Sequence, residues 1–121
     1  NTCWVAMTYS KSKAMIKVEK GEKLICVIAL GYGENQGVSH KSKSIEELSK
    51  VNGEMPDWFK KGMEAAMLAP TAMNQQKFLI SLEGNKVRAK ALTAFYSKLD
   101  LGIVKCHFEL GAGRDGWEWI E

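Results

Sequence analysis

The sequence predicts an α+β fold, and the order of its patterned segments is the basis for that prediction. The run KLICVIAL at 23–30 is short, β-branched and almost wholly apolar, which is typical of a buried central strand. Segment 55–69, MPDWFKKGMEAAMLA, repeats apolar residues at helical spacing. Segment 77–92 has the pattern of a β-hairpin, in which a second strand or the start of a helix follows the turn, and 100–113 has the pattern of another helix. Strand, helix, hairpin and helix in this order indicate an α+β protein.

The segments between 33 and 50 are shorter and more polar. Residues 33–43, GENQGVSHKSK, have the composition of a loop. Ser44 follows, with Glu47 three residues later, which is the spacing of a capping box. We expect one or two helical turns in SIEELSK.

Two longer helices are predicted with defined buried faces. In the first, Asp57 is placed to cap the N-terminus and Pro70 to stop the helix. Its buried face is expected to contain Trp58, Phe59, Met63, Ala66 and Met67. In the second, Asp100 is placed as the cap, and the glycines at 111 and 113 end the helix. Its apolar stripe contains Ile103, Val104, His107, Phe108 and Gly111.

Composition restricts the function classes. With 45% hydrophobic and 26% charged residues in 121, the chain is globular rather than disordered. The net charge of +3 is mild and spread out, so no nucleic-acid partner is expected. No apolar run approaches the roughly 20 residues of a membrane span, so no membrane partner is expected either. Three cysteines without a CxxC motif favour a reduced, cytoplasmic protein without a zinc site.

The stretch LAPTAMNQQKF at 68–78 lies between the first predicted helix and the hairpin. Its small residues would let a flat ring approach the backbone, and its amides offer donors and acceptors to the edge of a heteroaromatic ring. The alternative is a polar loop whose amides satisfy neighbouring backbone groups. Both interpretations are open on composition alone.

A second candidate is HKSK at 40–43. In an extended segment Lys41 and Lys43 point to the same side, so two ammonium groups can converge on one phosphate. The alternative is a solvated lysine loop. His40 and His107 have no cysteine or carboxylate at ligand spacing, so no metal site is predicted, and His107 is expected to be a core or interface histidine.

Four stretches together resemble the FMN-dependent nitroreductases and flavin reductases. APTAMNQQKF is similar to the family's A-P-S-x-x-N-x-Q-P-W segment, with Ala69, Pro70, Asn74 and Gln76 matching. Thr71 stands for serine, Phe78 for tryptophan, and Lys77 departs from the proline. NTCWV resembles G-T-C-W, the run 21–44 resembles a late strand and its K-x-R loop, and DLGIVKCHFELGAG resembles a helix of the form D-x-G-I-A.

The resemblance implies a mixed or antiparallel sheet flanked by helices, with FMN as cofactor. The flavin would pass hydride from NAD(P)H to a small-molecule acceptor such as a nitro compound or quinone. Pro70, Thr71 and Asn74 would contact the ring and ribityl side, and Lys41 and Lys43 the phosphate. Lys43 replaces an arginine and lacks its planar fork. No residue is assigned as an acid–base catalyst.

The order of the motifs is also informative. Motifs that come late in ordinary nitroreductases come first here, which resembles the single-chain branch built from two halves in tandem. Residues 1–43 would end the first half and residues 44–121 would form the second, so we expect an incomplete fold without its N-terminal half. Its partner would be that missing half or a second copy of the chain. The alternative function is a non-catalytic interaction module that binds no flavin by itself.

Overall fold

The computed structural model describes residues 1–6 and 16–121, which form two compact units, 1–39 and 40–121. The boundary between the units falls four residues before the predicted division at 43/44. The assignment of the two parts to two nitroreductase-like halves stays a prediction.

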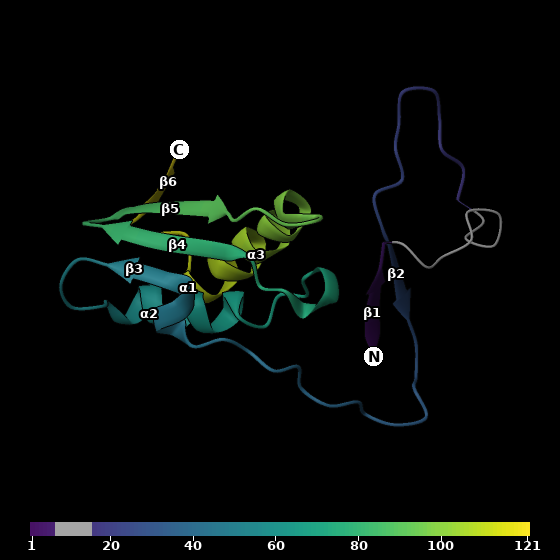
Figure 1. Ribbon diagram of the computed structural model, residues 1–121, viewed down its shortest axis with the longest axis horizontal. Helices are drawn as coiled ribbons and strands as arrows, with labels where there is room; N and C mark the ends of the chain where they lie inside the picture. The colour runs from purple at the N-terminus through teal and green to yellow at the C-terminus, as the bar shows by residue number, and fades with distance from the viewer. Residues whose placement is uncertain (7–15) are drawn as a thin grey trace. The chain divides into compact units, whose positions relative to one another are not determined.

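The first unit contains a two-stranded antiparallel sheet (Figure 1). Strand β1 (Thr2–Val5) pairs with β2 (Val27–Leu30), and Trp4 lies opposite Ile28. The prediction of a buried central strand over 23–30 is wrong. The strand is confined to 27–30, and Ile28 and Leu30 are 48% and 83% exposed. Among the described residues of this unit, β2 pairs only with β1, and no helix packs on the two-stranded sheet.

The second unit is built on a mixed four-stranded sheet in the order β3–β4–β5–β6 (Figure 1). The strands are β3 (Ser49–Val51), β4 (Phe78–Glu83), β5 (Lys86–Ala91) and β6 (Glu118–Ile120). The two outer pairs are parallel and the central pair is antiparallel. With its helices, this sheet confirms the predicted α+β class and the mixed sheet.

The predicted capping box forms at the start of helix α1 (Ile45–Leu48). The Glu47 backbone N–H donates to Ser44 Oγ at 3.3 Å, and the Ser44 N–H donates to Glu47 Oε2 at 3.0 Å. A hydrogen bond from its own backbone and one from the Ser44 hydroxyl lower the pKa of Glu46, which is fully exposed. The helix is a single turn because β3 begins directly after Leu48.

Helix α2 (Asp57–Ala66) has the predicted buried face. Phe59, Met63 and Ala66 are fully buried, and Trp58 and Met67 pack against them half-buried. Asp57 is not the cap, which corrects the prediction: Pro56 occupies the N-cap position and has no side-chain acceptor. The helix ends before Pro70 is reached, with Met67 at the C-cap.

The predicted hairpin is formed by β4 and β5, with Glu83 paired to Lys86 across a two-residue turn. The turn requires a left-handed first residue, and Gly84 supplies it at φ 62°. Phe78, Ile80 and Leu82 alternate along β4 and are buried, whereas the residues between them face the opposite side. One face of the sheet therefore carries the core.

Helix α3 (Ser97–Ala112) begins three residues before its predicted cap, so the assignment of Asp100 as N-cap is wrong. The Asp100 N–H already donates to the Tyr96 carbonyl at 2.9 Å, which places it within the first helical turn. The expected stripe does face the core: Val104 and Phe108 are fully buried. Strand β6 was not anticipated. Its pairing with β5 brings Trp119 and the preceding Trp117 onto the ring of Phe108.

Candidate functional site

The segment between α2 and β4 has an unusual backbone. It contains a short 3₁₀ helix, η1 (Ala72–Asn74), and three non-glycine residues with positive φ: Met73 at 50°, Asn74 at 53° and Gln76 at 47°. Asparagine tolerates this left-handed region, but methionine and glutamine adopt it at a cost. Such a conformation persists only where surrounding contacts fix it, and it is often found at binding sites.

Gln76 provides the first of these contacts. Its side chain is 3% exposed, and both ends of its amide are hydrogen-bonded. Oε1 accepts the Lys43 backbone N–H at 2.8 Å, and Nε2 donates to the Lys41 carbonyl at 2.8 Å. Nε2 also donates to Asn74 Oδ1 at 2.9 Å. One buried amide thus joins segment 41–43 to segment 74–76.

Asn74 and Thr71 complete this junction. Asn74 Nδ2 donates to the Lys41 carbonyl at 2.8 Å, so that carbonyl accepts from two amides. Thr71 Oγ1 accepts the Gln76 backbone N–H at 3.1 Å and closes the loop on itself. These bonds use the amides as the polar-loop interpretation expects, on neighbouring backbone groups. Whether Asn74 and Thr71 also contact a ligand stays a prediction.

A second junction ties the loop to the start of α3. Asp100 is 4% exposed, and its two carboxylate oxygens accept from different residues of the loop. Oδ1 accepts the Ala72 N–H at 3.0 Å, and Oδ2 accepts Gln75 Nε2 at 2.8 Å. Gln75 Nε2 also donates to the Phe95 carbonyl at 2.6 Å. The residue predicted to cap its own helix instead holds the candidate loop.

The two predicted lysines lie at this junction. The carbonyl of Lys41 and the N–H of Lys43 both bond Gln76, as groups on one edge of an extended segment would. Lys43 is half-buried, and its Nζ donates to the Gln76 carbonyl at 3.4 Å, whereas the Lys41 side chain is exposed. The structure therefore brings together the two segments predicted from sequence, although Gln76 lies 35 residues from Lys41.

Sequence reasoning missed the importance of Gln76 and Asp100 to this arrangement. The sequence indicates Gln76 only as a motif match and Asp100 only as a helix cap. The available signal was a run of three amides, Asn74, Gln75 and Gln76, beside a buried strand. Amide side chains that are buried need hydrogen-bond partners, but the run does not indicate which backbone groups are those partners. Pro70, also predicted, is half-buried at the start of the loop.

Other chemistry-bearing side chains lie outside this junction. His107 is half-buried and hydrogen-bonds the Ala65 carbonyl of α2 through Nδ1 at 3.3 Å, as expected of a histidine between packed helices. Cys3, Cys26 and Cys106 are free thiols. Within residues 1–6 and 16–121, no cluster of three metal-ligating side chains occurs. No helix in the same ranges has the length and apolarity to cross a bilayer.

Comparison with known proteins defines the class of this fold. A crystal structure described as that of a putative nitroreductase from Thermotoga maritima matches with a TM-score of 0.66 and 23% sequence identity. The match covers 91% of this chain and 44% of that one, so the chain spans less than half the length of that protein. The fold of this chain therefore corresponds to part of the fold of that protein.

The family follows from the sequence. The family described as "Putative TM nitroreductase" matches residues 1–112, and the chain belongs to it. This membership confirms the resemblance to nitroreductases that the four motifs indicate. It places the chain in a family of oxidoreductases. No curated protein matches the sequence.

Proposed function

We propose that this chain forms part of an FMN-dependent oxidoreductase and contributes the phosphate side and part of the ring side of the flavin site. Membership in a nitroreductase family supports the reaction class. The observation that carries the site is the Gln76 amide, which bonds the backbone of both Lys41 and Lys43. It holds two cationic residues beside a loop of small and amide side chains.

The residues at this junction fit an anionic ligand. Lys41 is exposed, and Lys43 is oriented by its bond to the Gln76 carbonyl. Two ammonium groups on one short segment, with its backbone fixed, can donate charge-assisted hydrogen bonds to the same phosphate. Because lysine is a point charge rather than a planar fork, it places less geometric demand on the ligand than arginine would.

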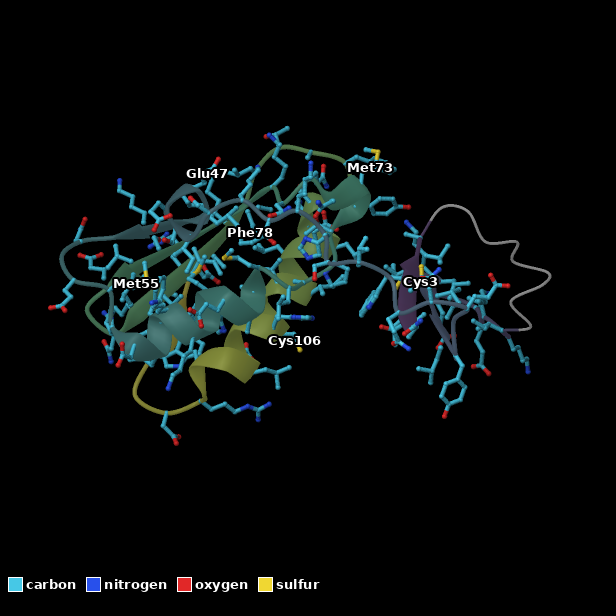
Figure 2. The ribbon with its side chains drawn as sticks, turned by 90° about the horizontal axis from the view of Figure 1, so that it is seen from below. Cys3, Glu47, Met55, Met73, Phe78 and Cys106 are labelled. Carbon is cyan, nitrogen blue, oxygen red and sulfur yellow. The ribbon has the colours of Figure 1, made fainter. Side chains whose placement is uncertain are left out.

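The adjoining loop fits the ring side of such a ligand. Ala72 and Thr71 are small, and the left-handed residues 73 and 74 turn the backbone sharply at the tip of the loop. Met73 projects from this tip and is 78% exposed (Figure 2). Asn74 Oδ1 accepts one hydrogen bond from Gln76 and has capacity for a second. Its contact with a flavin edge would use that remaining capacity.

FMN, when bound, supplies hydride transfer from NAD(P)H to a nitro compound, a quinone or a similar small acceptor. The chain's own residues bind and orient: Lys41 and Lys43 neutralise the phosphate, and Pro70, Thr71 and Asn74 shape the ring side. No side chain is assigned a proton transfer. The remaining walls of the site would come from another half of the protein or a second copy of the chain.

The test compares two flavins that differ only in the phosphate. In the Lys41→Ala/Lys43→Ala protein, affinity for FMN should fall by about 10²–10⁴-fold, since each lost charge-assisted contact contributes roughly 1.5–3 kcal/mol. Affinity for riboflavin should change little. Lys60→Ala/Lys61→Ala removes the same charge from exposed positions of α2 and serves as the control.

Visible absorbance of the purified protein and flavin fluorescence titration give the readout. Equal losses for FMN and riboflavin would contradict a phosphate role for the two lysines. The titrations use the intact protein, with its other half or second copy present. Absence of binding of either flavin by that unaltered protein would instead support the non-catalytic interaction module.

A further inference from the structure

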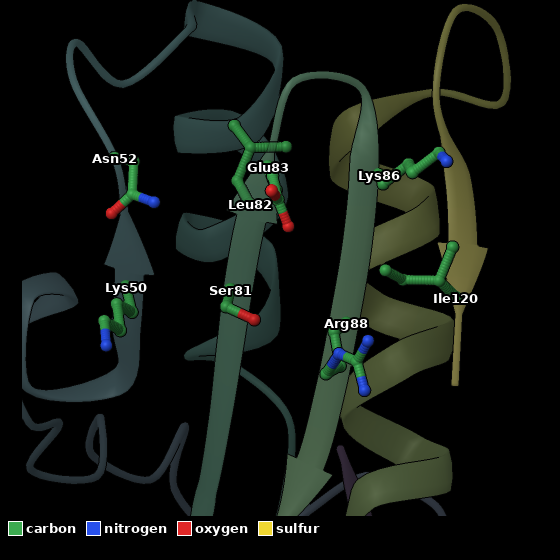
Figure 3. Close-up of a pocket in the computed structure, with 8 residues that line it drawn as sticks. All are labelled: Lys50, Asn52, Ser81, Leu82, Glu83, Lys86, Arg88 and Ile120. Carbon is green, nitrogen blue, oxygen red and sulfur yellow. The ribbon is translucent and has the colours of Figure 1, made fainter.

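The sheet of the second unit has a polar face opposite its core. Phe78, Ile80 and Leu82 point to the helices, so the alternate residues of β4, among them Ser81, point away from them. This outer face has a hollow of about 200 Å³ (Figure 3). Its lining comes from all four strands and the loop after β3, and its side chains on this face include Lys50, Ser81, Glu83, Lys86, Arg88 and Ile120.

The strand register places one row of these residues side by side. Lys50 pairs with Ser81, Ser81 with Arg88, and Arg88 with Ile120. Figure 3 shows Ser81 on the strand between those of Lys50 and Arg88. Adjacent strands lie about 4.8 Å apart, so two long cationic side chains flank one hydroxyl within reach of a common ligand. This row contains no carboxylate.

The neighbouring row has a different charge balance. Glu83 pairs with Lys86, and Lys86 pairs with Glu118. Lys86 therefore has a carboxylate opposite it on each side, and cross-strand pairs of opposite charge attract. The uncompensated positive charge of the hollow is consequently that of Lys50 and Arg88, on either side of Ser81.

We propose that this hollow binds the phosphate group of a small phosphate monoester. The Arg88 guanidinium can donate two parallel hydrogen bonds, the Lys50 ammonium can donate others, and the Ser81 hydroxyl can donate one. Together these donors can bond the three terminal oxygens of the phosphate. The side chain of Ile120 at the end of the row provides an apolar surface for the organic group of the ester. The small volume fits a compact ligand rather than a dinucleotide.

The charge pattern also decides against an extended polyanion. A nucleic-acid strand crossing the sheet would meet Glu83 and Glu118 directly beside the cationic row. Those carboxylates repel a continuous chain of phosphates but leave room for a single one. This site is separate from Lys41 and Lys43, and it does not depend on flavin binding.

The experiment is an NMR titration of amide resonances with inorganic phosphate and with phenyl phosphate, at constant ionic strength. Shifts should be centred on Lys50, Ser81 and Arg88. They should persist in the Lys41→Ala/Lys43→Ala protein, which separates this site from the proposed flavin-phosphate site. Phenyl phosphate should bind more tightly than inorganic phosphate because of Ile120.

Three variants sharpen the test. Arg88→Gln should weaken phosphate binding at least tenfold, and Arg88→Lys, which keeps the charge but loses the fork, by less. Lys90→Gln is the matched control, because Lys90 lies on the same strand two residues away, faces the same side, and does not line the hollow. It should change affinity less than twofold.

Equal weakening by Arg88→Gln and Lys90→Gln would overturn the proposal, because it would show only a diffuse charge effect. Shifts that vanish in the Lys41→Ala/Lys43→Ala protein would also overturn it. So would binding of an oligonucleotide that displaces phenyl phosphate and falls steeply with salt, since that would identify a polyanion surface.

Discussion

The side chain of Gln76 pairs with the backbone of Lys43 much as a neighbouring strand would. Its Oε1 accepts the Lys43 N–H at 2.8 Å, and its Nε2 returns a bond to the Lys41 carbonyl at 2.8 Å. The segment that carries the two lysines is thereby aligned without belonging to the sheet. The buried amide of Gln76 thus holds the backbone that carries the two lysines.

Removing that amide should loosen the lysine segment. Gln76→Ala leaves the Lys43 N–H without its partner and takes a donor from the Lys41 carbonyl. We expect a loss of about 1–3 kcal/mol in the free energy of unfolding. The Lys43 amide should also exchange its hydrogen faster. Urea denaturation and amide hydrogen exchange measure the two effects.

Gln76→Glu provides the comparison for this prediction. The glutamate keeps an oxygen for the Lys43 N–H but turns its second oxygen toward the Lys41 carbonyl, where two acceptors repel. Lys43 should therefore stay protected in this variant although stability falls. Unchanged protection of Lys43 in Gln76→Ala would show that the amide does not hold the segment.

Helix α2 depends on its fully buried methionine. Met63→Asp would place a carboxylate among Phe59, Phe78 and other core side chains with no partner to neutralise it. We expect a loss of at least about 4 kcal/mol in the free energy of unfolding, or failure to fold. Lys60→Asp on the exposed side of the same helix is the control and should cost under about 1 kcal/mol. Similar melting temperatures for the two variants would remove the assignment of this helix face.

The elements that sequence predicted well are those whose signal is local. The periodicity around Met63 and the alternation of Phe78, Ile80 and Leu82 are complete within ten residues, so α2 and the hairpin could be placed. The three-residue strands β3 and β6 have too few residues to show alternation, and they exist because β4 and β5 offer them edges. The composition of the apolar run that ends at Leu30 does not distinguish a buried central strand from a strand in an exposed two-stranded sheet. Its burial therefore cannot be predicted from the run alone.

The residues of the candidate site also fall into those that sequence predicted and those that it could not. Motif similarity predicted Lys41, Lys43, Pro70, Thr71 and Asn74 as site residues, and the structure brings their segments together. The bonds that do this join residues 25 to 35 positions apart, from Gln75 to Asp100 and from Lys41 to Gln76. No spacing rule in a single sequence relates such positions, so the anchoring residues could not be assigned.

The buried carboxylate of Asp100 should be sensitive to an isosteric change. Both of its oxygens accept hydrogen bonds, from the Ala72 N–H and from Gln75 Nε2. In Asp100→Asn one oxygen becomes an NH₂ group, which must face one of these donors. Because the new NH₂ group and the N–H it faces are both donors, one charge-assisted hydrogen bond is lost. We therefore expect a loss of about 1.5–3 kcal/mol in the free energy of unfolding.

The loss in Asp100→Asn should be accompanied by faster exchange of the Ala72 amide hydrogen. Gln75→Ala tests the same junction from the other side and should cost less, since the Ala72 bond remains. Wild-type stability and protection in Asp100→Asn would mean that Asp100 does not anchor the loop.

Two glycines of α3 should respond in opposite directions to the same substitution. A methyl group at Gly111 would meet the backbone carbonyl oxygen of Lys61 and would lie 2.6 Å from the Cβ of Ala65. Neither can rotate away, because one is backbone and the other is a methyl group on a packed helix. Gly111→Ala must therefore push α2 and α3 apart, at a cost of about 1–3 kcal/mol in the free energy of unfolding.

Gly102 lies in the same helix but is exposed, and a methyl group there meets no atom within 4 Å. Since glycine is a poor helix former, Gly102→Ala should stabilise the protein by about 0.5–1 kcal/mol. Urea denaturation of both variants under one set of conditions gives the comparison, and helix propensity cancels between them. The difference that remains measures how closely α2 and α3 approach at Gly111. Stabilisation by both substitutions would show that the helices have room for the extra methyl group and do not pack at that distance.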